Sequence, residues 1–222
     1  MTVLTKIDTP LGVMIAASDK VALTGLWFEG QKYECAFVKN PEWDDSLALW
    51  DSVKTWINQY YHEKTPGTPL FSIAYEGGTP FQQSVWNTLL EIPFGEVWTY
   101  NEVTHHVSEK IGRRTSPRAV ANAIGKNPIA LLVPCHRVIA TTGKLTGFAG
   151  GLNRKTTLLE LDGHQIQGDT VIHNEAYNNE SNRFGIYRLN DCTSIQFIDS
   201  LCSCHYCDFK CNGYKENLFS GH

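Results

Sequence analysis

The sequence predicts an α/β segment followed by a mainly helical segment. In the first 78 residues, short apolar runs of strand length alternate with turn residues and with one amphipathic helical pattern. After residue 78, three short helical patterns follow one another, and each begins with a Ser or Thr that can cap it. From residue 165 the chain is rich in Asn, Ser and Asp and has no sustained period. We therefore expect domains at 1–78 and 79–164, and a loosely ordered C-terminal extension at 165–222.

The composition is ordinary for a soluble globular protein. Of the 222 residues, 42% are hydrophobic and 19% are charged, which argues against global disorder. No apolar run approaches the ~20 residues that a membrane span needs, and the first residues lack the apolar stretch of a signal peptide. We therefore expect a cytoplasmic protein without a membrane partner.

The α/β segment divides into strands and one helix. Turn residues separate three strand-like runs, which lie at residues 3–7, 13–17 and 22–28. We expect a helix to begin at Ser46, because the apolar residues after it repeat every three or four positions and so form one buried face. These apolar residues are Leu49, Trp50, Val53, Trp56, Ile57, Tyr60 and Tyr61. Residues 70–75 have the pattern of a further strand.

The helical segment carries three N-terminal capping signals. Thr79 precedes a proline, which is favoured in the first helical position. Residues 99–102, Thr-Tyr-Asn-Glu, form a capping box for a second helix that we expect to end near Gly112. Ser116 caps a third helix, and residues 153–161 predict a closing one. The second and third helices, joined by a glycine-containing turn, have the pattern of a helix-turn-helix.

Basic residues are concentrated in one stretch of the chain. The net charge is −4, from 19 basic and 23 acidic residues. Nine of the basic residues and none of the acidic ones lie between Lys110 and Lys155. Such an acid-free stretch in an acidic chain predicts a site for a polyanion such as a nucleic acid. The alternative is a basic face that only contacts solvent.

Cys135 is the candidate nucleophile. It follows a short apolar run and stands next to His136 and Arg137. The thiolate is the nucleophilic form of cysteine, and cationic neighbours lower its pKa. His136 could take the thiol proton directly or through a water if a carboxylate orients its ring, and Glu160 and Asp162 are the nearby candidates. The alternative is that Cys135 is a small buried core residue.

A nucleophile beside a basic helical module favours attack on a nucleic acid or its adduct. A base inside a duplex is out of reach, so this chemistry would need the base to be flipped out.

Several segments together resemble one protein family. In the helical segment they are Asn127-Pro128, VPCHRVI at 133–139, GFAGGL at 147–152, LLELDG at 158–163, FGEV at 94–97, TY at 99–100 and RAV at 118–120. In the first segment they are TPLG at 9–12 and LTGL at 23–26. With these segments, residues 1–164 resemble the methylated-DNA–protein-cysteine methyltransferases, the O6-alkylguanine repair proteins.

The resemblance implies a fold and a reaction. The fold would be a small ribonuclease H-like α/β domain followed by a winged helix-turn-helix-like catalytic domain. The protein would be a DNA-repair enzyme that moves a methyl or alkyl group from O6-alkylguanine, and also from O4-alkylthymine, to Cys135. The base would be flipped out of the duplex, and each protein molecule would react once. The implied partner is double-stranded DNA containing O6-alkylguanine, and we expect a monomer with no cofactor and no metal.

The resemblance also implies roles for individual residues. His136, oriented by Asp162 and acting through a water, would deprotonate Cys135, and Tyr100 would donate toward guanine N3 as the leaving group gains charge. Arg118 would enter the base stack where the guanine has left it. The other implied DNA contacts are Thr99, Ala119, Ala121, Lys126 and Arg137. The implied substrate pocket consists of Asn127, Val138, Phe148 and Ala149.

Two residues depart from the usual pattern of the family. Asp162 stands where glutamate is usual, so the carboxylate that reaches toward His136 is one methylene shorter. This bears on the efficiency of thiol activation. Phe148 stands where tyrosine is frequent, which removes one hydroxyl from the pocket wall.

Two other functions are compatible with the sequence. One is a DNA-binding regulator in which Cys135 is structural, and lesion-independent binding of particular DNA sequences would favour it. The other is a cysteine hydrolase of small substrates that uses Cys135 and His136, and multiple turnover on an ester or amide would favour it.

The C-terminal extension holds five of the seven cysteines. Its possible metal ligands are Cys202, Cys204, His205, Cys207 and Cys211, which include a C-x2-C and a C-x3-C spacing that could bind zinc. A zinc site usually has two separated ligand pairs, and only Cys192 lies further away. We therefore prefer an extension without metal.

Overall fold

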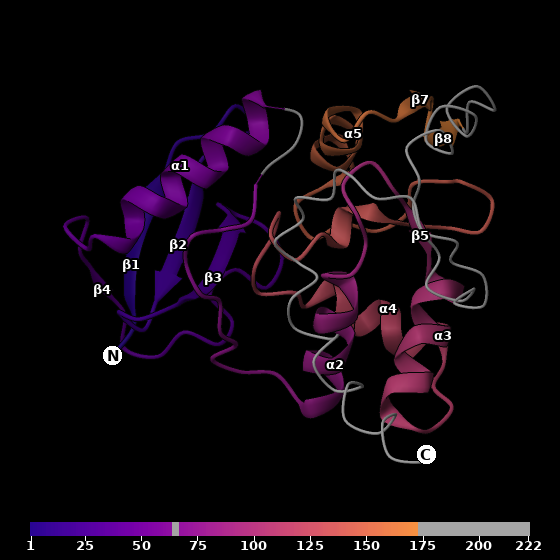
Figure 1. Ribbon diagram of the computed structural model, residues 1–222, viewed down its shortest axis with the longest axis horizontal. Helices are drawn as coiled ribbons and strands as arrows, with labels where there is room; N and C mark the ends of the chain where they lie inside the picture. Colours follow the sequence, from indigo (N-terminus) through magenta and orange to yellow (C-terminus); the bar gives the residue numbers. More distant parts are fainter. Residues whose placement is uncertain (64–66, 173–222) are drawn as a thin grey trace, which may run out of the picture. The chain divides into compact units, whose positions relative to one another are not determined.

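Residues 1–63 and 67–172 are described by the computed structural model (Figure 1). Contacts between residues group all of these residues into one compact unit, which contains both segments that the sequence predicts as domains. The cysteines of the predicted C-terminal extension lie outside the described residues.

A four-stranded sheet forms the centre of the N-terminal segment. Its strands are β1 (Val3–Ile7), β2 (Met14–Ser18), β3 (Leu23–Phe28) and β4 (Glu42–Trp43). The strand order is β3-β2-β1-β4, with β2 antiparallel to both neighbours and β4 parallel to β1. The three strands predicted from the sequence are confirmed to within one residue at each end.

Alternate residues of the strands point to opposite faces of the sheet. Met14 and Phe28, which pair across β2 and β3, belong to the large hydrophobic core. The next pair, Ile15 and Trp27, belongs to a smaller cluster. The sheet is therefore buried on both faces.

Helix α1 (Leu49–His62) lies along the sheet (Figure 1). Its buried residues keep the predicted spacing and are Trp50, Val53, Trp56, Ile57, Tyr60 and Tyr61. The predicted start at Ser46 is wrong: the N-cap is Ala48, and Ser46 Oγ instead donates to Asp44 Oδ1 (2.6 Å). The predicted strand at 70–75 is also wrong, because only Ile73 forms a bridge there, to β3.

Three helices pack against one another in the second segment (Figure 1). They are α2 (Pro80–Leu89), α3 (Tyr100–Ile111) and α4 (Pro117–Gly125). Each begins at its predicted cap: Thr79 and Thr99 form capping boxes, and Ser116 accepts a hydrogen bond from Ala119 N. Helix α3 ends at Gly112, whose φ of 66° suits the left-handed C-cap conformation that glycine adopts without strain.

The chain before Cys135 is attached to the edge of the sheet. Leu26 in β3 forms a parallel bridge with Ile129, and Leu26 N donates to Pro128 O (2.8 Å). The two segments therefore share one hydrophobic core, which includes residues of α1, of α2 to α4 and Cys135 itself.

The remaining elements include Cys135 and the chain that follows it. They are the 3-10 helix η1 (Cys135–Arg137), the parallel strands β5 (Trp98–Thr99) and β6 (Val138–Ile139), helix α5 (Leu152–Leu161), and the hairpin of β7 (Gln165–Gln167) and β8 (Thr170–Ile172). The closing helix is confirmed within one residue of its predicted start. The hairpin extends the folded part beyond the predicted boundary at residue 164, because Val171 is buried against Ile139, Leu145 and Leu159.

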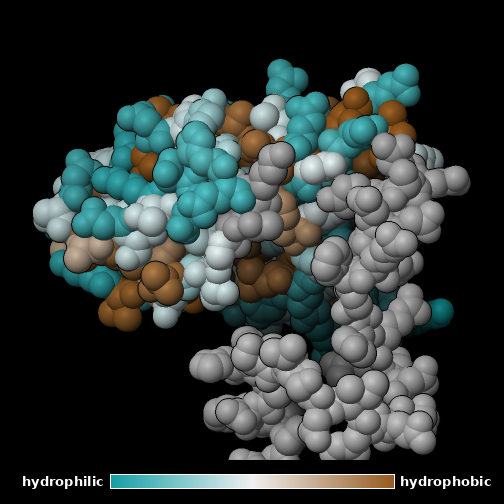
Figure 2. All heavy atoms as spheres, turned by 45° about the horizontal axis from the view of Figure 1, so that its top comes forward, coloured by the Kyte–Doolittle hydropathy of each residue, from teal (hydrophilic) through white to brown (hydrophobic). Residues whose placement is uncertain are grey.

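The surface is mixed in character. On the face shown in Figure 2, hydrophobic residues lie in separate groups among hydrophilic ones. Across residues 1–63 and 67–172, no helix combines the length and the apolar character needed to cross a bilayer.

Candidate active site

Cys135 is held in a tight turn by Asn127. The Asn127 amide donates to Cys135 Sγ (3.1 Å) and to Val133 O (2.8 Å), and its Oδ1 accepts from Ile129 N (3.0 Å). Leu131 within this turn has a φ of 67°, which is rare for a non-glycine residue. Cys135 is only 7% exposed. The structure thus places Asn127 and Cys135 in direct contact.

The resting thiol is held in its protonated form. Burial raises the pKa of Cys135, and this effect outweighs the opposing influence of the Asn127 amide and the Lys155 ammonium group. A buried thiol of raised pKa needs a base before it can act as a nucleophile.

His136 is the adjacent base, and it is fully buried. Its Nε2 lies 3.3 Å from Asp162 Oδ2 and 3.0 Å from the hydroxyl of Tyr60 in α1. Burial lowers the pKa of His136 despite the Asp162 carboxylate, so the ring is neutral at neutral pH. Its Nδ1 is buried and has no hydrogen-bond partner among the described residues.

Asp162 accepts hydrogen bonds from three side chains. Besides His136, Arg137 Nε donates to Oδ2 (2.6 Å) and Tyr60 donates to Oδ1 (2.9 Å). Burial alone would raise the pKa of Asp162, but its bonds to His136 and Arg137 hold that pKa at about 2. Asp162 is therefore charged, and it is the carboxylate next to His136, whereas the other candidate, Glu160, is exposed.

Arg137 does not lie where a DNA contact requires it. Its side chain is buried, and besides Asp162 it donates from Nη1 to Ile92 O (3.0 Å). A guanidinium in these bonds cannot reach a phosphate, so the predicted DNA contact of Arg137 is corrected to a structural ion pair.

Lys155 is a second buried residue of the basic stretch, after Arg137. It is fully buried on α5, and its ammonium donates to Val138 O (2.5 Å) and Thr146 O (3.0 Å). Burial lowers its pKa to about 8. Lys155 belongs to the acid-free basic stretch, but Leu158 and Leu159, three and four residues on, predict that it lies on the buried face of the helix.

Tyr100 and three of the predicted pocket residues, Val138, Phe148 and Ala149, come from separate parts of the chain. The Tyr100 hydroxyl donates to Thr146 O (3.3 Å), the carbonyl that also accepts from Lys155. Val138 is buried in β6, and Phe148 and Ala149 are half-buried in the loop before α5. Phe148 packs against the hydrophobic core to which Cys135 belongs.

The remaining predicted DNA contacts lie on α4 or at an end of α3 or α4. Arg118 is exposed, and Ala119 and Ala121 are half-buried. Lys126 is half-buried with its ammonium 5.8 Å from the Tyr33 ring. Thr99 is half-buried and serves as the N-cap of α3.

The exposed basic surface is smaller than the sequence predicts. Lys110 pairs with Glu91 (2.5 Å) and Lys144 with Asp169 (2.8 Å), while Arg154 donates to two backbone carbonyls. Three exposed arginines make no ion pair with any residue of the described chain; they are Arg113, Arg114 and Arg118, around the turn between α3 and α4.

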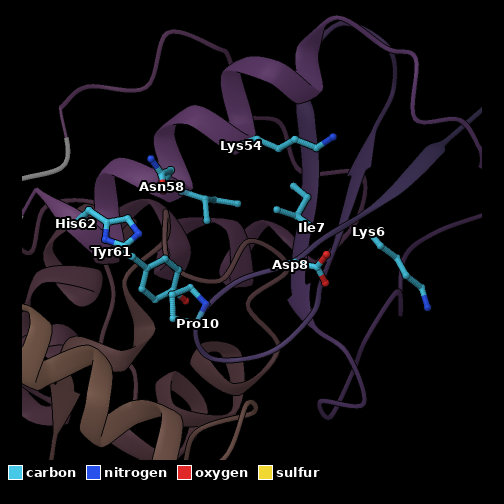
Figure 3. A pocket seen from close by; sticks show the side chains of 9 residues that line it. Lys6, Ile7, Asp8, Pro10, Lys54, Asn58, Tyr61 and His62 are labelled. Carbon is cyan, nitrogen blue, oxygen red and sulfur yellow. The ribbon is translucent and has the colours of Figure 1, made fainter.

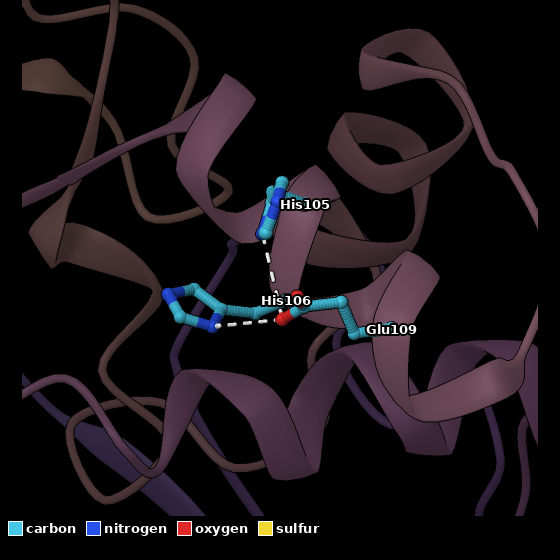
Figure 4. A group of neighbouring side chains, drawn as sticks. All are labelled: His105, His106 and Glu109. Atoms are coloured by element: carbon cyan, nitrogen blue, oxygen red, sulfur yellow. Dashed lines mark ion pairs between the residues drawn. The ribbon is translucent and has the colours of Figure 1, made fainter. Parts of the chain in front are cut away.

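Two surface features lie outside this site. A cavity of about 350 Å³ between β1 and α1 is lined by residues such as Lys6, Asp8 and Tyr61, and Cys135 is not in it (Figure 3). On α3, the Nδ1 atoms of His105 and His106 lie 3.5 and 4.0 Å from Glu109 Oε2 (Figure 4). These three side chains could hold a metal ion, although ion pairing with one carboxylate also accounts for their arrangement.

Known proteins match the chain over both segments. Residues 80–164 match the family described as 6-O-methylguanine DNA methyltransferase, DNA binding domain. A protein of Mycobacterium leprae named methylated-DNA–protein-cysteine methyltransferase is 40% identical over 160 residues, which covers 72% of this chain and 91% of the relative. A protein of the same name from Haemophilus influenzae is 35% identical over 156 residues, covering 69% of this chain and 82% of the relative.

A solved structure gives the same result. The crystal structure of Mycobacterium tuberculosis OGT in complex with DNA matches with a TM-score of 0.64 and 37% identity, and covers 72% of this chain and 93% of that one. The fold and the cysteine site thus define an alkyltransferase-type enzyme. The chain belongs to the methylated-DNA–protein-cysteine methyltransferase family, and the predicted family and enzyme class are confirmed.

Proposed function

We propose that this protein repairs DNA by moving an alkyl group from O6 of guanine in duplex DNA to Sγ of Cys135, once per protein molecule. One observation supports this proposal most. A buried thiol held by Asn127 is followed in the chain by a neutral histidine that has a charged carboxylate at one ring nitrogen and no described partner at the other. This is the arrangement that a protonated thiol needs for activation.

Thiol activation would run through His136. The Tyr60 hydrogen is donated to Asp162, so His136 Nε2 carries its own proton and donates it toward Tyr60 and Asp162. Nδ1 is then the basic nitrogen, and it takes the Cys135 proton through a water. The Asp162 carboxylate stabilises the imidazolium that forms, and Arg137 keeps that carboxylate charged.

The transfer itself is a single displacement. The Cys135 thiolate supplies the electron pair of the new carbon–sulfur bond, and the bond between the alkyl carbon and O6 breaks with its pair left on guanine. The proton taken by His136 returns through water to the leaving base, and the guanine is restored. Because a thioether does not revert under these conditions, the protein is consumed.

Tyr100 is the donor for the leaving group in this proposal. Burial raises the pKa of its hydroxyl, so the hydroxyl keeps its proton at neutral pH. Its bond to Thr146 O is long (3.3 Å), so it can be exchanged at small cost for a bond to guanine N3. A donor aimed at developing charge lowers the barrier of such a step. O4-alkylthymine offers the same kind of leaving oxygen and would be a second substrate.

The target base would be flipped out of the duplex. In this proposal α3 and α4 act as a helix-turn-helix of a winged type, next to a ribonuclease H-like N-terminal domain. Arg118 enters the stack from the start of α4, and the small side chains of Ala119 and Ala121 allow close approach to the minor groove. Thr99, Lys126, Arg113 and Arg114 lie nearby in sequence as candidate phosphate contacts. The protein would act as a monomer.

The Cys135→Ala variant tests the assignment of the nucleophile. We expect it to transfer no alkyl group from an O6-methylguanine duplex, and to bind that duplex as tightly as the wild type does. Transfer can be followed by peptide mass mapping and binding by fluorescence anisotropy. A methyl group found on a residue other than Cys135, or residual transfer by the variant, would contradict the proposal.

A further inference from the structure

We propose that Tyr60, a residue of the N-terminal segment, is a positioning residue of the thiol-activating site: its hydroxyl fixes which nitrogen of His136 is the base. This inference rests on the function proposed above and extends it. It gives the N-terminal segment, which holds neither the nucleophile nor the predicted DNA contacts, a part in the chemistry.

The Tyr60 hydroxyl lies closer to His136 and to Asp162 than these two side chains lie to each other. Its hydroxyl lies 3.0 Å from His136 Nε2 and 2.9 Å from Asp162 Oδ1, whereas the direct distance between His136 and Asp162 is 3.3 Å. Normal hydrogen bonds of this type are about 2.9–3.0 Å long. Of the two groups at Nε2, the Tyr60 hydroxyl is therefore the nearer acceptor.

The Tyr60 hydroxyl links the short Asp162 side chain to His136. Its Oδ2 already accepts the 2.6 Å bond from Arg137, so His136 shares that oxygen with a guanidinium. Tyr60 connects the other oxygen, Oδ1, to the same ring nitrogen. The Tyr60 hydroxyl thus bridges the distance between the short Asp162 side chain and His136 Nε2.

The direction of the bonds determines the tautomer. Burial, and after it the charge of Asp162, raises the pKa of Tyr60, so the hydroxyl keeps its single proton and gives it to Asp162. The Tyr60 oxygen can then only accept from Nε2, which must carry the proton of the neutral imidazole ring. His136 Nδ1 is left with its lone pair, and Nδ1 is the nitrogen without a described partner.

The Tyr60 ring is fixed from several sides. It is 1% exposed and packs edge-on against the rings of Tyr61 (5.7 Å), Phe94 (6.3 Å) and His136 (6.3 Å). A phenylalanine would keep these contacts and lose only the hydroxyl. Tyr60→Phe therefore removes the proposed role with little loss of packing.

The neighbouring residue supplies a matched control. Tyr61 is buried on the same helix and lines the cavity of Figure 3, but its hydroxyl is buried without a hydrogen bond to His136 or Asp162. Tyr61→Phe makes the same chemical change one position away from the site.

The first measurement is the single-turnover rate of methyl transfer from an O6-methylguanine duplex, as a function of pH. We expect Tyr60→Phe to be about tenfold slower than wild type near neutral pH, the effect of one lost hydrogen bond in a buried polar site. The defect should disappear once the pH exceeds the pKa of Cys135, because the thiol then ionises without a base. Tyr61→Phe should follow the wild type, and the affinity for DNA should be unchanged in both variants.

The charged groups around His136 bear on this pH profile. They are Lys155 in α5, Asp162 at the C-cap of α5, Arg137 in η1 and the Cys135 thiol itself. Lys155, with a pKa of about 8, titrates within the measured range, but it does so in all three proteins. The ratio of the rates of Tyr60→Phe and Tyr61→Phe cancels its effect.

A second measurement needs no DNA. The rate at which iodoacetamide modifies Cys135, read from the Cys135 peptide by mass spectrometry, reports thiolate formation against pH. Tyr60→Phe should require a higher pH than Tyr61→Phe for the same rate. If Tyr60→Phe matches Tyr61→Phe in both measurements, or is slower by the same factor at every pH, the inference is wrong. If the wild type itself transfers no methyl group to Cys135, the proposed function fails instead.

Discussion

Replacing Asp162 with asparagine should destabilise the protein strongly, because it breaks a buried ion pair while keeping the size of the side chain. The Asp162 side chain is fully buried and receives a 2.6 Å bond from Arg137, which is itself 8% exposed. In the variant, Arg137 keeps its charge without a counter-ion. Removing one partner of a buried pair costs about 3–5 kcal/mol. We expect a loss of this size in the free energy of unfolding at neutral pH.

The same variant has a predictable dependence on pH. The pKa of Asp162 is about 2 in the folded protein, against an ordinary value of 3.8. Because the folded value is the lower one, the charged carboxylate adds stability above pH 4 and loses this contribution as the pH falls toward 2. A shift of nearly two units corresponds to about 2.5 kcal/mol. The difference in stability between wild type and Asp162→Asn should narrow by most of this amount between pH 4 and pH 2, and by the rest below pH 2.

Urea unfolding of both proteins between neutral and acidic pH measures this difference. Asp169→Asn is the matched control, because Asp169 also pairs with a cation, Lys144, but both side chains are 56% exposed. Exposed pairs contribute little, so the control should unfold like the wild type. A stability difference for Asp162→Asn that stays constant with pH, or that matches the control, would refute the reasoning.

Two further variants test the turn that holds Cys135 and the proposed DNA contact of Arg118. Asn127→Ala leaves Val133 O and Ile129 N without their side-chain partner, which should cost about 2–4 kcal/mol in urea unfolding. It should also raise the pKa of Cys135, read by iodoacetamide labelling, and an unchanged pKa would count against the Asn127 contact. Arg118→Ala removes an exposed side chain, so its stability should stay within about 0.5 kcal/mol of wild type. Its methyl transfer should fall about tenfold; unchanged transfer would remove Arg118 from the DNA-contacting set.

Local chemistry made the helix starts predictable from the sequence. Thr79, Thr99 and Ser116 each cap the helix that follows, because a capping bond needs only residues within three positions. Ser46 failed as a cap because its hydroxyl bonds to Asp44 instead. The β7–β8 hairpin was missed because each strand has three residues, and its buried contact, Val171, depends on distant side chains.

The active site was predictable only in part. Cys135 and His136 are neighbours in the chain, and the resemblance to the family placed Asp162 with them. Tyr60 was predicted only as a core residue on an apolar helix face, because nothing local connects it to His136, which lies 76 residues away. The burial of Arg137 was missed for a similar reason. Its charge is balanced by Asp162, a partner that only the folded chain brings near.

In the proposed function, Cys135 accepts one alkyl group, and the protein molecule is then inactive. The most direct test is to titrate the protein with a duplex that carries a single O6-methylguanine. The mass of the intact protein is measured by mass spectrometry after each addition. We expect a gain of one methyl group per molecule, located on Cys135, with no further repair once all the protein is modified. Repair of more lesions than there are protein molecules, or an unmodified Cys135 after repair, would contradict it.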